Sequence, residues 1–298
     1  MKDIKVLLST YNGEKYLEEQ INSLLQQQAV KISILARDDG SKDSTINILE
    51  KYKRKGSLEW YTGDNLRPAK SFWDLIMKAP ESDYYALCDQ DDYWCPDKLS
   101  DAISKLSFYD DRPALYFSQT SLVDSNLQPI HTPVIKPLCT IGEALITHCA
   151  TGCTFVFNKK LLEVLRLYQP EYFSMHDNWI YRVCLVVGGV VIYDPSSHIL
   201  YRQHSNNVIG LRRSKIDVLK CRFKRLFNSD HERCKIAKEL ILGYGSFMNK
   251  DDFYLVSLAS TCDKSLLSRI NLIFNKKVKC SSMKCNISSR LAILLGIY

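Results

Sequence analysis

Three carboxylates lie within four residues of one another, at Asp89, Asp91 and Asp92. They follow the short apolar run 84–88, which contains two tyrosines and predicts a buried strand that ends in the acidic residues. Carboxylates this close raise one another's pKa unless a cation lies between them. Mg²⁺ binds through oxygen ligands, commonly one or two carboxylates together with substrate phosphates. The pattern therefore indicates a site for a divalent metal and a diphosphate, with a solvated acidic turn as the alternative.

Two further acidic elements occur at the boundaries of predicted secondary structure. Asp38 and Asp39 follow the apolar run 32–36, and His176 and Asp177 open a predicted helix. Ligands of open α/β sheets bind beyond the carboxyl ends of the strands. The first acidic pair and the acidic cluster are therefore expected at the same edge of a parallel sheet.

Strands and helices alternate over the first hundred residues. The predicted strands are short, largely apolar runs, as in strands buried on both faces of a parallel sheet, and the predicted helices carry apolar residues on one side. The alternation predicts an α/β fold, a Rossmann-like parallel sheet with right-handed crossovers. The expected strands are 4–9, 32–36, 58–62 and 84–88, and the expected helices are 14–27, 43–55 and 69–78.

Beyond residue 92 the alternation loosens. Neither a G-x-G-x-x-G sequence after the first strand nor a G-x-x-x-x-G-K-[ST] sequence is present. A diphosphate is therefore expected to be held by metal and side chains, not by a glycine-rich loop. The pattern predicts further strands at 115–123, 152–157, 190–193 and 199–203, and helices at 96–107, 161–168 and 175–187.

The net charge of +7 hides an asymmetry along the chain. Residues 211–298 carry 18 basic and 7 acidic residues, whereas residues 1–210 carry 22 and 26. We therefore expect an α/β domain over 1–210 and a helical basic region over 211–298. Basic and apolar residues interleave in 211–227, which suits a helix on an anionic membrane surface. Packing on the core or on another copy of the chain is the alternative.

The sequence shows no export signal and no apolar stretch long enough to cross a membrane. The 11 cysteines form no repeating framework, as is usual for thiols in a reducing compartment. A cytoplasmic location is expected, with peripheral contact at the inner face of the cell membrane if the basic region binds lipid.

Five motifs resemble those of the inverting glycosyltransferases of family 2, which have the GT-A fold. They occur in that family's order and cover residues 4 to about 210. The last two are closest to bacterial rhamnosyltransferase-like members that build cell-surface polysaccharides. The motifs are Ser9-Thr10-Tyr11-Asn12-Gly13, Asp38-Asp39-Gly40-Ser41-x-Asp43, Asp89-x-Asp91-Asp92-x-Trp94-x-Pro96-x-Lys98-Leu99, His176-Asp177-x-Trp179 and Tyr201-Arg202-Gln203-His204-x-Asn206-Asn207.

The resemblance implies a nucleotide site at the ends of the first strands. Asp38 or Asp39 would accept the N3–H of a pyrimidine, since a carboxylate is a hydrogen-bond acceptor. Tyr11 would stack on the base. Ser9 would line the same pocket, and Lys70 lies where many relatives place a basic residue near the diphosphate or the base.

The resemblance also implies a metal site. Asp89 and Asp91 form the family's D-x-D, with Asp89 beside the nucleotide as well and Asp91 a direct ligand of Mg²⁺ or Mn²⁺. The metal would neutralise charge on the leaving nucleoside diphosphate. His204 is a third ligand of the metal, a phosphate ligand or an ordinary loop histidine. Arg202 contacts phosphate or pairs with a surface acid.

Asp177 matches the family's catalytic base. An acceptor hydroxyl needs a carboxylate to take its proton. A helix N-terminus would keep the pKa of that carboxylate low, burial would raise it, and an ordinary N-cap is the alternative role. His176 would support the base or touch the acceptor. Trp94 and Trp179 would stack on sugar rings or fill the core.

The sequence thus predicts a metal-dependent, inverting hexosyltransferase, with rhamnose as the sugar that the resemblance suggests. The donor would be a nucleotide-diphosphate sugar, and the acceptor a glycan or lipid-linked oligosaccharide. Nucleic acid is not an expected partner, because no binding motif accompanies the basic residues. The alternatives are a sugar-1-phosphate nucleotidyltransferase and a non-catalytic glycan-binding or assembly subunit.

Overall fold

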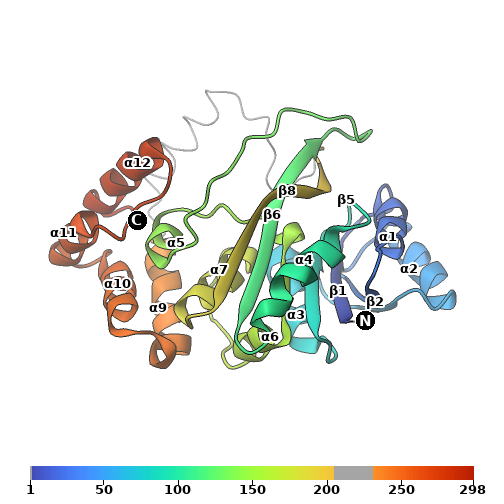
Figure 1. The fold of residues 1–298 in the computed structure, drawn as a ribbon, viewed down its shortest axis with the longest axis horizontal. Helices are drawn as coiled ribbons and strands as arrows, with labels where there is room; N and C mark the ends of the chain where they lie inside the picture. Colours follow the sequence, from blue (N-terminus) through green and yellow to red (C-terminus); the bar gives the residue numbers. More distant parts are fainter. Residues whose placement is uncertain (1, 205–230) are drawn as a thin grey trace.

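The computed structural model describes residues 2–204 and 231–298, and a single mixed sheet lies at its centre (Figure 1). The strand order is β3-β2-β1-β4-β7-β6-β8-β5. The predicted alternation of strands and helices is confirmed in the first half, where the strands are parallel. These elements are β1 (Asp3–Thr10), α1 (Leu17–Leu25), β2 (Lys31–Asp38), α2 (Thr45–Arg54), β3 (Glu59–Thr62), α3 (Arg67–Lys78) and β4 (Tyr84–Cys88).

The register of the parallel strands brings their carboxyl ends to one edge. Thr10 of β1 lies opposite Asp38 of β2, and Leu8 lies opposite Cys88 of β4. β2 is longer than predicted because its last residues pair with β1 on one side and β3 on the other. Asp39 and the acidic loop after Cys88 therefore leave the sheet at the same edge, as predicted.

The second half of the sheet mixes both strand directions. β8 is one strand where two were predicted, because it pairs with β6 along most of its length through register shifts at Gln119. The predicted strand 152–157 is a 3-10 turn, η2 (Gly152–Thr154), followed by a short strand. The elements are β5 (Tyr93–Trp94), α4 (Lys98–Leu106), η1 (Ser107–Tyr109), β6 (Ala114–Val123), α5 (Ile141–Ile146), β7 (Val156–Asn158), α6 (Lys159–Leu165), α7 (His176–Val186) and β8 (Val190–Arg202).

Two clusters of buried side chains lie on opposite faces of the sheet. Successive residues of β1 divide between them, with Leu7 in one cluster and Val6 and Leu8 in the other. One cluster packs against α1, α2 and α4. The other packs against α3, α5, α6, α7 and the C-terminal helices. The helices of both layers therefore hold the strand ends in fixed relative positions.

Residues 231–298 are mainly helical, as predicted, and gather at the end of the molecule away from α1 and α2 (Figure 1). None of the described helices has the length and apolar character needed to cross a bilayer. The predicted boundary at 210 and the segment 211–227 lie outside the described residues, so the division into two regions stays a prediction. The helices are α9 (Glu232–Tyr244), α10 (Lys250–Thr261), α11 (Leu266–Phe274) and α12 (Met283–Leu294), with a 3-10 turn, η3 (Gly245–Phe247), after α9.

The C-terminal region packs closely on α5. The Tyr298 hydroxyl donates to the carbonyl of Leu145 at 2.8 Å, which satisfies one of the carbonyls that a helix end leaves unpaired. Gly142 lies against the backbone between α11 and α12. A Cβ at Gly142 would come within 1.9 Å of the Lys277 carbonyl oxygen. Only glycine allows this approach.

Gly142→Ala is expected to lower the free energy of unfolding by about 1–3 kcal/mol, the usual cost of forcing atoms into a packed region. Urea unfolding of the full chain measures the change. Lys277→Ala is the control, because it keeps the backbone carbonyl and removes only an exposed side chain that pairs with Asp251. Equal stability of Gly142→Ala and the wild type would contradict this packing.

Candidate active site

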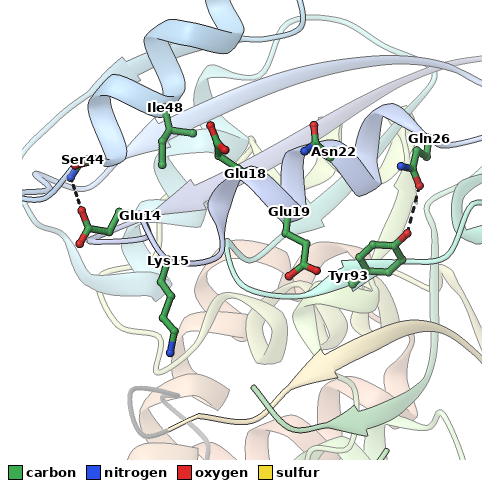
Figure 2. A pocket seen from close by; sticks show the side chains of 9 residues that line it. All are labelled: Glu14, Lys15, Glu18, Glu19, Asn22, Gln26, Ser44, Ile48 and Tyr93. Atoms are coloured by element: carbon green, nitrogen blue, oxygen red, sulfur yellow. Dashed lines mark hydrogen bonds between the residues drawn. The ribbon is translucent and has the colours of Figure 1, made fainter. Parts of the chain in front are cut away.

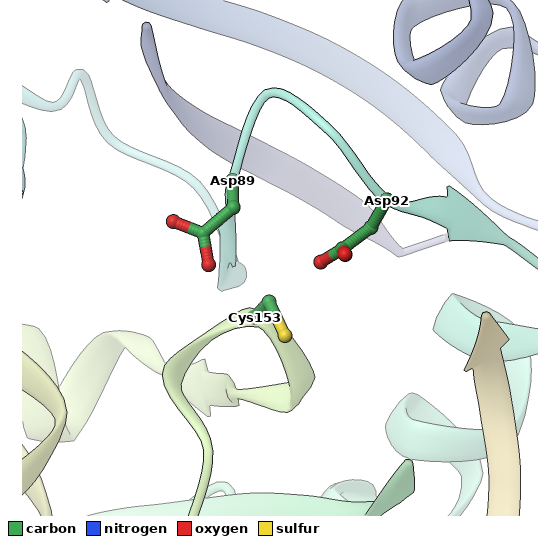
Figure 3. A group of neighbouring side chains, drawn as sticks. All are labelled: Asp89, Asp92 and Cys153. Atoms are coloured by element: carbon green, nitrogen blue, oxygen red, sulfur yellow. The ribbon is translucent and has the colours of Figure 1, made fainter. Parts of the chain in front are cut away.

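The acidic cluster lies in the loop between β4 and β5. Asp92 is fully buried, and the backbone N–H of Arg202 donates to its Oδ1 at 3.1 Å. Its other carboxylate oxygen has no hydrogen-bond partner among the described residues. Figure 3 shows Asp89 and Asp92 on the side of the loop that faces Cys153. The ligand atoms of these three residues lie within 4.8 Å of one another.

The surroundings of these carboxylates oppose ionisation of all of them at once. Burial raises the pKa of Asp89, and the charges of Asp91 and Asp177 raise it further. Burial also raises the pKa of Asp92 well above its ordinary value, and Asp91 and Asp89 add to this. Burial raises the pKa of Cys153 too, so its sulfur is a thiol. The donors are therefore carboxylate oxygens, a set that fits a hard divalent cation.

Two basic residues balance this negative charge from within the protein. Lys98 is buried, and its ammonium lies 3.5 Å from the centre of the Trp94 ring. Burial lowers the pKa of Lys98 to about 8, against the charges of nearby groups that include Asp92. Arg202 is also buried, and its Nε donates to the carbonyl of Asp91 at 2.8 Å. Arg202 thus holds the backbone of the acidic loop, and it pairs with Glu19, which agrees with the second predicted role, pairing with an acid.

The predicted metal ligands Asp91 and His204 lie together. His204 Nε2 is 2.8 Å from Asp91 Oδ2. The imidazole also lies beside the Tyr16 ring, with 5.2 Å between the ring centres. His204 lies two residues after the end of β8, so pairing of β8 with β5 and β6 brings this distant residue to the acidic loop.

Asp177 lies in the first turn of α7 and is mostly buried. Its Oδ2 accepts from the N–H of Gly152 at 3.3 Å, and His148 Nε2 is 3.6 Å from the same oxygen. Burial raises the pKa of Asp177, but His148, His176 and the N–H of Asn178 outweigh it and bring the pKa to about 2. The sequence weighed the helix N-terminus against burial, but the two histidines contribute most of the lowering, and Asp177 is ionised at neutral pH.

His176 is buried against the ring of Phe72, with 4.1 Å between the ring centres. Burial lowers its pKa to about 4, so the imidazole is neutral at neutral pH. A Cβ at Gly152 would come within 2.7 Å of His176 Nε2, so the glycine leaves room for the ring. His176 therefore lies beside Asp177 as a packed, neutral support.

The acidic pair after β2 is engaged in local contacts. Asp38 Oδ2 accepts from the N–H groups of Gly40 and Ser41, at 3.1 Å each, and its Oδ1 is buried with no partner among the described residues. Asp39 pairs with Arg37 and accepts from two backbone N–H groups in the loop before α3. Asp39 thus anchors this loop. A hydrogen bond from a pyrimidine base to Asp38 or Asp39 stays a prediction.

The remaining predicted nucleotide residues lie at the same sheet edge. Ser9 Oγ is 2.6 Å from Ser71 Oγ of α3. Tyr11 is 43% exposed, so a face of its ring is open to a planar ligand. Lys70 is exposed on the first turns of α3. Their roles at a nucleotide stay predictions.

The two tryptophans lie in the core. Trp94 is fully buried beneath Lys98, and Trp179 packs between Phe173 and Tyr244. A ring with no exposed face cannot stack on a sugar in this structure. The core-filling alternative therefore replaces the sugar-stacking interpretation for both residues.

A hollow of about 770 Å³ follows the outer side of α1 (Figure 2). It touches the site through Glu19, the partner of Arg202, and through Tyr93, which follows Asp92. None of the residues predicted for the site is among those that line it, so it carries no functional assignment. The lining residues are Glu14, Lys15, Glu18, Glu19, Asn22, Gln26, Ser44, Ile48 and Tyr93.

Comparison with known proteins decides the family. Residues 5–166, more than half of the chain, match Glycosyl transferase family 2. The chain belongs to this family. It is therefore a glycosyltransferase, and the resemblance drawn from the five motifs is confirmed.

Two curated relatives illustrate how far the similarity extends. The transferase is 29% identical over 241 residues to the dTDP-rhamnosyl transferase RfbG of Shigella flexneri, which covers 74% of this chain and 78% of RfbG. It is 34% identical over 109 residues to the poly(ribitol-phosphate) β-N-acetylglucosaminyltransferase TarS of Staphylococcus aureus strain Mu50. That match covers 34% of this chain and 18% of TarS.

Solved structures confirm the GT-A fold. Residues 1–349 of S. aureus TarS superpose with a TM-score of 0.60 at 18% identity, covering 99% of the transferase and 81% of that chain. The mannosyltransferase PcManGT from Pyrobaculum calidifontis, in complex with GDP-Man and Mn²⁺, gives a TM-score of 0.53 at 14% identity. It covers 99% of the transferase and 85% of that chain.

Sequence reasoning gave no site role to His148 or Lys98, and it placed Asp92 in the acidic cluster without a role of its own. His148 lies between α5 and η2, where no periodic pattern or motif draws attention to it. Lys98 and Asp92 belong to the third motif, but sequence alone does not reveal that both are buried. The signal that the sequence does contain is a lysine six positions after the last aspartate of the cluster.

Asp91→Asn is expected to leave the metal-free transferase as stable as the wild type or more stable, because it removes one of several repelling carboxylates. The amide oxygen still accepts from His204. In the wild type, Mn²⁺ at 100 times its dissociation constant adds about 2.7 kcal/mol, and the variant loses most of this. Urea unfolding with and without Mn²⁺ measures both effects. Asp111→Asn, in an exposed pair with Arg112, is the control, and undiminished Mn²⁺ stabilisation of the Asp91 variant would remove Asp91 from the metal site.

His148→Gln is expected to raise the pKa of Asp177 from about 2 toward the ordinary value of about 3.9, because a positive neighbour is lost. A lowered carboxyl pKa stabilises the fold above pH ~4, and this stabilisation is lost as the pH falls toward 2. The variant should therefore lose less stability between these pH values. Carboxyl-selective NMR titration measures the pKa, with exposed His131→Gln as the control. An unchanged pKa would assign the low value to His176 and the N–H donors.

Proposed function

We propose that this glycosyltransferase moves a hexosyl unit from a nucleotide-diphosphate sugar to a hydroxyl of a glycan or lipid-linked oligosaccharide, with inversion, in cell-surface polysaccharide synthesis. The observation that carries the proposal is the position of ionised Asp177. It lies near enough to Asp89 for its charge to raise the pKa of that residue. A catalytic base close to the diphosphate site is the arrangement that a single displacement at the anomeric carbon needs.

The donor is proposed to be a rhamnosyl nucleotide, with dTDP as the nucleotide to test first. One relative, which matches 74% of the chain, is a dTDP-rhamnosyl transferase, and this supports the assignment. The TarS structure in complex with UDP-GlcNAc is 19% identical in sequence to this chain, so it supports the fold and not the donor. We assign the nucleotide to the residues at the ends of β1, β2 and β4 and on α3, namely Ser9, Tyr11, Asp38 or Asp39, Lys70 and Asp89.

Asp89 and Asp91 are proposed to hold Mg²⁺ or Mn²⁺, with His204 as a further ligand of the metal or of phosphate. The support is chemical, since crowded, partly buried carboxylates that repel one another accept a hard cation. The bound metal would neutralise charge on the departing diphosphate. Arg202 would keep the loop in place, and buried Lys98 would supply a positive charge near Asp92.

Asp177 is proposed to take the proton of the acceptor hydroxyl. The hydroxyl oxygen forms the bond to the anomeric carbon, the bond from that carbon to the diphosphate oxygen breaks, and the proton goes to the Asp177 carboxylate. One displacement inverts the anomeric centre. A pKa of about 2 keeps Asp177 ionised but makes it a weak base. A negatively charged donor and exclusion of water both raise a carboxylate pKa, so donor binding would strengthen the base.

Membership of the family favours this reaction over sugar-1-phosphate nucleotidyl transfer and over a non-catalytic assembly role. We also propose a cytoplasmic location, at the inner face of the cell membrane where the acceptor is lipid-linked.

Asp177→Asn is expected to keep donor binding and to lose transfer by about 10²–10⁴-fold, the usual contribution of a general base. The amide has nearly the same shape and still accepts from the N–H of Gly152, but it cannot take the proton. Calorimetry with dTDP-rhamnose and Mn²⁺ measures binding, and single-turnover assays with a glycan acceptor measure transfer.

The control for this experiment is Asp111→Asn, which should leave both quantities unchanged. Transfer by the Asp177 variant within a few-fold of wild type would place the base elsewhere. A thermal-shift panel of UDP-, dTDP- and GDP-sugars with Mn²⁺ identifies the donor separately. No stabilisation by any of them would contradict the proposed function.

A further inference from the structure

The outer surface of α11 and α12 is rich in exposed apolar side chains. On α11 the exposed large residues follow helical spacing, with Leu266, Ile270 and Phe274 in one stripe and Leu267 beside it. On α12 a second stripe is formed at the same spacing. Its members are Met283, Ile287, Leu291, Leu294 and Leu295, which are 50–77% exposed. We call the two stripes together the α11–α12 surface.

The inner side of α12 buries only Ile293 among its large apolar residues, beside polar groups. Ser289 is buried and its hydroxyl donates to the carbonyl of Ile146 at 3.4 Å. Asn286 exchanges hydrogen bonds with the backbone of Cys280. A helix on a water-soluble protein normally turns its apolar stripe inward. Here the apolar stripe is outward, which marks an interaction surface.

The segment that carries this surface has only positive side chains, and Asp251 of α10 pairs with one of them, Lys277. Residues 264–298 contain no aspartate or glutamate. The basic side chains of Lys276, Lys279, Lys284 and Arg290 are exposed and make no ion pair within the described part of the chain. The full set of basic residues is Lys264, Arg269, Lys276, Lys277, Lys279, Lys284 and Arg290.

We infer that the α11–α12 surface binds the interface of an anionic lipid bilayer. Leu, Ile, Phe and Met side chains on one face with lysine and arginine at the rim are the composition of helices that lie in the interface plane. Anionic headgroups attract the basic residues, and the apolar stripes enter the acyl boundary. A second copy of the chain suits the surface less well, because a twofold contact would place the same positive surface against itself.

This inference rests on the membrane location in the proposed function and names the surface that would bind there, but it needs neither donor nor metal, so flotation can fail while transfer remains. It is independent of residues 211–227, which suggested a membrane contact in the sequence and lie outside the described residues. The α11–α12 surface carries the inference by its own exposure and charge. Both helices pack on the core through α10 and α5, so a membrane bound here would be fixed relative to the candidate active site.

The test is flotation of the full chain with vesicles of phosphatidylcholine alone or with phosphatidylglycerol. The wild type is expected to float with the anionic vesicles, and less at high salt because exposed charges are screened within about 10 Å at 0.1 M. Leu267→Asn with Phe274→Asn should lower the vesicle partition coefficient at least about tenfold, since two large apolar groups no longer leave water. Both residues are exposed, so thermal melting should match the wild type.

Phe108→Asn with Val134→Asn is the matched control, because these residues are similarly exposed but lie outside the C-terminal helices. It should float like the wild type. Lys276→Glu with Lys279→Glu should weaken binding to anionic vesicles only. Absence of flotation by the wild type, or equal flotation of the Leu267/Phe274 variant, would overturn the inference. So would light scattering that shows a wild-type dimer and a monomeric Leu267/Phe274 variant, since that assigns the surface to a second copy.

Discussion

Carboxylates at the end of β4 repel one another in a place where little water can screen them. Asp92 is fully buried, and the pKa values of Asp89 and Asp92 are raised by burial and by the neighbouring charges. The loop is kept in this unfavourable arrangement by contacts from distant elements. Arg202 at the end of β8 holds the loop backbone, and Lys98 of α4 supplies a buried positive charge nearby. The fold therefore prepares a position that a divalent cation would stabilise.

Asp89 and Asp177 lie near one another, but their surroundings shift their pKa values in opposite directions. Asp89 has its pKa raised by burial and by negative neighbours, whereas Asp177 has its pKa lowered to about 2, because His148 and N–H donors outweigh burial. Pairs of titratable groups whose pKa values are pushed apart are typical of sites that divide acid, base and metal-binding roles. The difference arises from contacts that α7 and the segment before η2 bring to Asp177, and not from the sheet edge itself.

The C-terminal helices connect the sheet to a surface of a different kind. Their inner contacts include close packing at Gly142 and the hydrogen bond from Tyr298 to α5. The outer sides of α11 and α12 expose apolar stripes. Rotation of either helix about its own axis would turn its stripe toward the core. The inner contacts fix that rotation, and the positive charge of the region then favours an anionic surface as the partner.

Local patterns in the sequence determined the parallel half of the sheet, because continuous apolar runs and helical periodicity depend only on neighbouring residues. They also placed the residues after β2 and β4 at one edge, since parallel strands share that edge. The order of five motifs was enough for the family. Burial depends on which distant segments pack together, and no local pattern records it. Only the tertiary structure therefore decided that Trp94 and Trp179 fill the core, that His148 lies beside Asp177, and that α12 turns its apolar side outward.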